Sequence, residues 1–138
     1  MFGERYVDMQ LFKILLSMLA LSLSAAAIAQ QDVASLMKSI VVPASDRVFA
    51  VGKAAPKSDA EWMAVQQNAE RLAAAAQQLA ALPPLNAKAD WARFASGMGN
   101  AARAAANAAR EKNLDHVMDA GDELNDTCEG CHKVYLKK

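Results

Sequence analysis

Apolar residues recur at helical spacing in four stretches of the chain, and no stretch alternates in the way that is typical of a strand. The pattern predicts helices over residues 31–52, 58–82, about 87–113 and 114–135. Pro43 is expected to kink or break the first of them, because proline lacks a backbone donor and its ring clashes one turn back. The chain is therefore expected to be all-α.

Small side chains dominate the inner faces of the second and third helices. Ser58 and Glu61 form a capping-box pattern before the second helix, and Pro83-Pro84 ends it. Four helices with short connections predict an antiparallel four-helix bundle, and the many alanines predict a close approach of its helices. The residues expected to face inward are Val33, Leu36, Met37, Ile40 and Val41; Trp62, Val65, Ala69, Leu72, Ala76 and Leu79; Trp91, Phe94, Met98, Ala102, Ala105 and Ala109; and Leu114, Val117, Gly121, Leu124, Cys128, Cys131 and Tyr135.

The two cysteines of the chain lie in one motif, Cys128-Glu129-Gly130-Cys131-His132. C-x-x-C-H is the attachment signature of c-type haem, with two thioether links through the cysteines and an iron bond through the histidine. Positions i, i+3 and i+4 share one face of a helix, so all three side chains point the same way. Both cysteines also continue the apolar seam of the last helix. We therefore expect one covalent haem c inside the bundle, where it supplies part of a core otherwise made of small side chains.

Other roles fit this motif less well. A thioredoxin-like C-x-x-C belongs beside a βαβ pattern, which is absent here. A structural zinc site needs four ligands, whereas the motif offers three and the only other histidine, His116, is far away. Cysteines three residues apart on one helix are also poorly placed for an unstrained disulfide. His116 is expected to be a solvated side chain near a helix start.

Residues 1–29 have the pattern of a cleaved secretory signal peptide. Residues 11–23 are an apolar run, and Ala27-Ile28-Ala29 has the form of a cleavage site. The run is too short for a stable membrane span, and an uncleaved anchor is the alternative. A start at Met9 would give a better n-region. Cleavage leaves residues 30–138 as one domain and predicts export to the periplasm.

The charge balance argues against nucleic acid as a partner. The 138 residues include 15 basic and 15 acidic side chains, and residues 1–29 contain two of each sign. The exported part is therefore formally neutral and has no basic field to attract nucleic acid. Two thiols in an oxidising compartment would pair unless they were committed elsewhere, and haem attachment commits them.

Residues 31–138 resemble the class II c-type cytochromes, the cytochrome c-prime group of four-helix haem proteins. The resemblance rests on Cys128, Cys131 and His132 in the last helix, where class I cytochromes carry the motif near the N-terminus. It also rests on the aromatic Tyr135 and on the pair Leu36-Met37 in the first helix. Low-spin members of the group place an axial methionine at that position, so the resemblance implies that Met37 is the second axial ligand.

The methionines differ in how well they suit that role. Met118 is about 21 Å from His132 along the same helix and is excluded. Met63 is off its seam, and Met98 faces inward in the middle of a helix beside two glycines. Met37 faces inward, but its pattern alone also suits simple packing, for which methionine is a good gap-filler. The resemblance favours Met37 as the ligand.

One position departs from the family pattern. Leu136 stands where many members carry a basic residue after the aromatic. The contact to a haem propionate is then unassigned, with Lys137, Lys138 and Arg47 as candidates.

The sixth iron ligand separates two expected functions. With a methionine the protein is a periplasmic electron carrier, and with an apolar residue it is a five-coordinate haem protein that binds nitric oxide or carbon monoxide. An enzyme is not expected, because no paired base and nucleophile remains once His132 binds the iron. The expected partner is an unidentified redox protein, and the group includes monomers and homodimers.

Overall fold

The computed structural model describes residues 32–84 and 86–136. All regular secondary structure in this part of the chain is helical, which confirms the all-α class there. None of the described helices is long and apolar enough to cross a membrane. The signal peptide predicted over residues 1–29 and the alternative start at Met9 lie outside the described residues.

The first helix continues through Pro43 and changes its winding just before it. α2 (Val33–Leu36) leads into a π-helical turn, η2 (Met37–Val41), and then into α3 (Val42–Phe49). The backbone N–H that follows the π turn donates to the carbonyl of Met37, five residues back. In a regular α-helix the proline would remove a donor and its ring would clash with the preceding turn. The sequence predicted a kink or a break at Pro43. The structure instead has a π turn just before the proline, where the helix is locally wider.

The next turn and helix agree with the capping signals in the sequence. The first helix ends in a short 3-10 turn, η3 (Ala50–Gly52), and α4 spans Asp59–Ala81. The hydroxyl of Ser58 accepts from the Glu61 N–H, and the Glu61 carboxylate accepts from the Ser58 N–H. This reciprocal pair confirms the predicted capping box.

The last two helices meet at a short connection. α5 (Asp90–Arg110) begins later than predicted, because residues 86–89 form turns after the proline pair. α6 (Leu114–Tyr135) has the predicted bounds. The side chain of Asn113 caps it by accepting a hydrogen bond from the His116 N–H at 3.1 Å.

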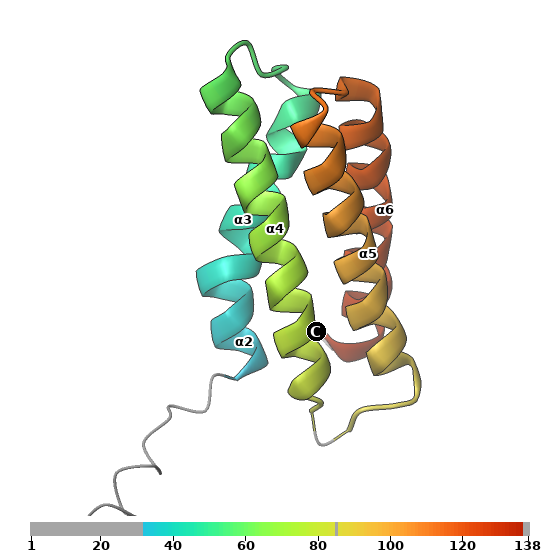
Figure 1. Ribbon diagram of the computed structural model, residues 1–138. Helices are drawn as coiled ribbons and strands as arrows, with labels where there is room; N and C mark the ends of the chain where they lie inside the picture. Colours follow the sequence, from blue (N-terminus) through green and yellow to red (C-terminus); the bar gives the residue numbers. More distant parts are fainter. Residues whose placement is uncertain (1–31, 85, 137–138) are drawn as a thin grey trace, which may run out of the picture. The chain divides into compact units, whose positions relative to one another are not determined.

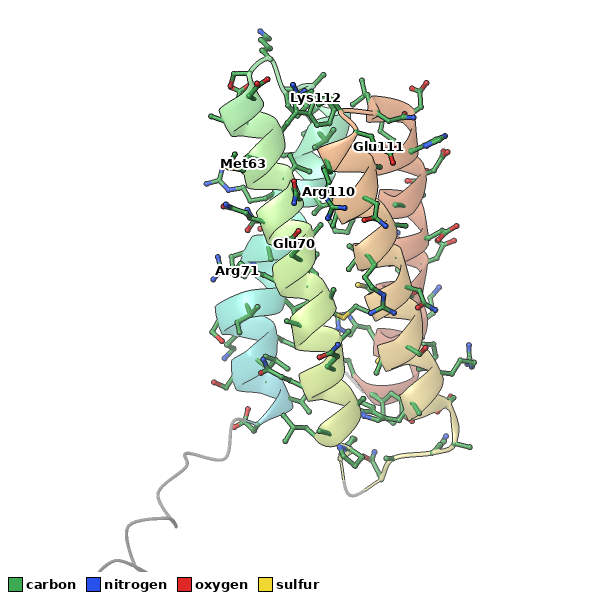
Figure 2. The ribbon with its side chains drawn as sticks, in the orientation of Figure 1. Met63, Glu70, Arg71, Arg110, Glu111 and Lys112 are labelled. Atoms are coloured by element: carbon green, nitrogen blue, oxygen red, sulfur yellow. The ribbon has the colours of Figure 1, made fainter. Side chains whose placement is uncertain are left out.

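The helices lie side by side in the part of the chain that the structure describes (Figure 1). α4 packs against α3 and α5, α5 packs against α6, and α3 also contacts α6. This packing is consistent with a helical bundle in which the four helical segments share one interior. On the outer surface Arg110 of α5 lies 3.7 Å from Glu70 of α4, an exposed ion pair that contributes little to stability (Figure 2).

Small side chains fill most of the interior. More than half of the buried apolar residues in the described part are alanines. The largest side chains with almost no exposure are Leu36, Leu72, Leu124 and Val117. Because an alanine buries little apolar surface, each helix pair gains less from burial than it would with larger residues.

Two glycines of α5 lie where that helix touches its neighbours. A Cβ at Gly97 would lie 3.2 Å from Thr127 of α6, and one at Gly99 would lie 3.3 Å from Ala76 of α4. Glycine costs about 1 kcal/mol relative to alanine within a helix. Here the missing side chains allow a close approach of α5 to both neighbours, which explains two residues that helix propensity alone disfavours.

Candidate functional site: an apolar cavity at the C-x-x-C-H motif

A cavity of about 140 Å³ lies between the first helix and α4, α5 and α6. All four residues predicted to hold a haem line it: Met37 from η2, and Cys128, Cys131 and His132 from α6. The structure therefore brings together side chains that lie more than ninety positions apart in the sequence. Other wall residues that bear on its chemistry are Val41, Ser45, Phe49, Trp91, Phe94 and Met98.

The motif occupies the last two turns of α6. Cys128 and Cys131 are partly buried and pack against the hydrophobic core. His132 is more exposed and lines the cavity at its edge. The helical register that the sequence predicted therefore places two sulfur atoms and one imidazole beside the same space.

The surroundings of both thiols favour their protonated form. Burial raises the pKa of Cys128, and negative charge on Cys131 would raise it further. Burial also raises the pKa of Cys131, and the carboxylate of Asp90 adds to that effect. Cysteine pairs used for redox exchange have lowered pKa values instead. These thiols are mostly neutral near pH 7 and do not have the activation expected of a redox-active pair.

The described methionines fall into two groups. Met37 is partly buried on the π turn and packs against the core, and Met98 of α5 is buried; both line the cavity. Met63 is 56% exposed on the outer side of α4 (Figure 2). Met118 of α6 is 44% exposed. The cavity thus offers two thioethers from two different helices, of which sequence reasoning favoured only the first.

The ring of Phe94 on α5 packs against the motif at Gly130. A Cβ at Gly130 would lie 2.9 Å from Cε1 of the Phe94 ring, closer than side-chain atoms pack. Glycine between the two cysteines therefore lets this ring lie against α6. The guanidinium of Arg93 lies 4.5 Å from the centre of the same ring. Sequence reasoning placed Phe94 on the inner face of its helix but missed this contact with the motif.

The residue types that line the cavity are those that a covalently held porphyrin needs. Two thiols, an imidazole and a thioether border one largely apolar space, which matches the attachment and axial groups of haem proteins. The volume of about 140 Å³ is below the roughly 300–1,000 Å³ of pockets for drug-sized ligands. A porphyrin therefore fits only when wall side chains move outward.

Two residues considered from the sequence lie elsewhere. Arg47 lines a separate hollow of about 330 Å³ beside the loop before α4, and it does not line the motif cavity. His116 is exposed, and its Nδ1 lies 3.0 Å from the side-chain amide nitrogen of Asn113, as suits a solvated histidine at a helix start. Among the described residues, no three His, Cys, Asp or Glu side chains are grouped so that they could hold a metal ion.

Comparisons of the chain with protein-family models, with curated proteins and with solved structures find no match. The function is therefore inferred from the motif and from the cavity that the motif borders.

Proposed function

We propose that the protein is a periplasmic electron carrier with one covalent haem c, a class II c-type cytochrome built as an antiparallel four-helix bundle. This proposal rests on one observation: the same largely apolar cavity is bordered by Cys128, Cys131, His132 and Met37. Three of these residues form a haem attachment signature in the sequence. The fourth comes from another helix and supplies the donor type of a second axial ligand.

The two cysteines hold the porphyrin by thioether bonds. Cys128 and Cys131 would each hold the porphyrin through one of its vinyl groups, with the sulfur bonded to one vinyl carbon and a hydrogen added to the other. Both thiols border the same cavity, so one porphyrin could reach both of them. Attachment also prevents the two sulfur atoms from pairing after export.

His132 and Met37 would supply the two axial ligands of the iron, since both line the cavity. When bound, the haem supplies one-electron chemistry through its ferric and ferrous states. A thioether is a soft neutral donor that favours the ferrous form, and it raises the reduction potential. The cavity wall around Met37 is largely apolar, which would limit the access of water to an iron bound there. The protein then needs no substrate chemistry of its own, and its partner is an unidentified redox protein that a monomer or homodimer meets in the periplasm.

A gas-binding haem protein is the second candidate, and one observation favours it. Met37 is only partly buried and packs against the core, while the cavity wall beside it includes the apolar Val41. If Met37 serves only as packing, the second face of the iron borders an apolar space. In that case the protein binds nitric oxide or carbon monoxide there.

The optical spectra of the oxidised and reduced exported protein separate the two candidates. An electron carrier with a Met37 ligand is expected to be six-coordinate and low-spin in both states, and its ferrous form is expected to bind carbon monoxide poorly. A high-spin ferrous spectrum with ready carbon monoxide binding would instead support the gas-binding function. The same samples, measured without carbon monoxide, serve as the control.

A further inference from the structure

Tyr135 links the end of α6 to the start of α5. Its hydroxyl donates to Oδ1 of Asp90 at 2.6 Å, and it accepts from the backbone N–H of Lys88 at 3.0 Å. Tyr135 is the last residue of α6 and stands three positions after His132. Its polar contacts therefore hold the turn that carries the histidine.

The ring of Tyr135 makes a second set of contacts with the wall of the cavity. Its centroid lies 5.0 Å from that of Trp91 and 6.4 Å from that of Phe94, in both cases edge to face. Trp91 is buried, and its indole N–H donates to the carbonyl of Leu79 at 2.9 Å. Tyr135 is thus connected through Trp91 to α4 as well as to α5.

Tyr135 holds the last turn of α6, the part of that helix that carries His132. The last turn of a helix has carbonyl groups without intrahelical donors and opens more easily than the middle of the helix. The polar neighbours on this turn do not tie it to another helix, since Lys133 pairs with Glu129 of α6 itself at 3.2 Å. The Tyr135 contacts do reach another helix, and Tyr135 stands about one helical turn after Cys131.

We propose that Tyr135 and Asp90 form a positioning pair, which fixes the last turn of α6 against α5 and so aligns the His132 imidazole with Met37 across the cavity. The role rests on the proposed function, because it concerns the axial ligands of a bound haem. Neither residue lines the motif cavity. The pair acts by limiting how far the histidine can move when its helix end opens.

The test compares Tyr135→Phe, Asp90→Ala and Asp90→Asn in the exported protein. Tyr135→Phe keeps the ring and loses the hydroxyl, whereas Asp90→Asn keeps an oxygen that can accept from the phenol. Two quantities are measured: backbone amide exchange in the last turn of α6, and the carbon monoxide binding rate of the ferrous protein. Lys133→Ala is the matched control, because it removes a polar contact on the same turn without breaking a link to another helix.

A lost hydrogen bond of about 1 kcal/mol corresponds to a change of roughly fivefold. Tyr135→Phe and Asp90→Ala are therefore expected to speed both amide exchange and carbon monoxide binding by roughly five- to tenfold. Asp90→Asn should recover most of the change, and Lys133→Ala should resemble the wild type.

Three results would overturn the positioning role. Wild-type exchange in Tyr135→Phe would show that the hydroxyl does not hold the helix end. Faster amide exchange with an unchanged rate of carbon monoxide binding would show that the contact is structural and does not affect the axial ligands. A protein that carries no haem would overturn the proposed function together with the positioning role, and the exchange data would then describe only the helix end.

Discussion

The double variant Cys128→Ser/Cys131→Ser is expected to be free of haem and to unfold on heating in a broad, uncooperative transition. The reason is the composition of the interior. More than half of its buried apolar residues are alanines, and few large side chains are fully buried. A covalent porphyrin in the motif cavity would supply much of the missing apolar contact, and a ligand that binds only the folded chain stabilises it.

Thermal unfolding followed by circular dichroism measures this effect. A loss of about 3 kcal/mol would lower the melting temperature by roughly 12–24 °C in a domain of this size. The single variants Cys128→Ser and Cys131→Ser are the matched controls, because each keeps one thiol for attachment and is expected to lie between the wild type and the double variant. A double variant that melts as sharply and at the same temperature as the haem-loaded protein would show that the helices are stable without the porphyrin.

Replacing Met37 with alanine is expected to convert most of the protein from a six-coordinate low-spin form to a high-spin form. The side chain borders the same cavity as His132 and comes from a different helix, through the π turn η2. Removing its thioether leaves the iron with one axial protein ligand. The reduction potential should fall, and the ferrous protein should bind carbon monoxide readily.

Two other methionines make this experiment specific. Met98 also lines the cavity, and Met98→Ala is expected to keep the low-spin spectrum with some loss of stability, since it removes a buried side chain. Met63 is exposed, and Met63→Ala is expected to change neither property. A low-spin Met37→Ala protein together with a high-spin Met98→Ala protein would assign the ligand to Met98.

The sequence predicted the helices well where the local signals and the packing agreed. The bounds of α6 and the Ser58–Glu61 capping box follow from residue types at fixed spacing. The first helix was harder. A proline predicts a disturbed helix. Whether the helix breaks or forms a π turn depends on which backbone N–H groups donate to the carbonyls before the proline.

The candidate site was only partly predictable for a similar reason. Cys128, Cys131 and His132 belong to one local motif, so their common direction follows from helical geometry. The contact between Phe94 and Gly130 depends on how closely α5 approaches α6, and helical spacing does not encode that distance. The same holds for Met98, whose inward direction was predicted and whose place on the cavity wall was not.

The central claim is that Cys128 and Cys131 bind a haem covalently, and the mass of the exported protein after acid-acetone extraction tests it most directly. Non-covalent haem is removed by that treatment, whereas thioether-linked haem remains with the chain. We predict a mass equal to that of the polypeptide plus one haem. A mass equal to that of the polypeptide alone, from protein that was exported and matured in a cell able to attach haem, would contradict the claim.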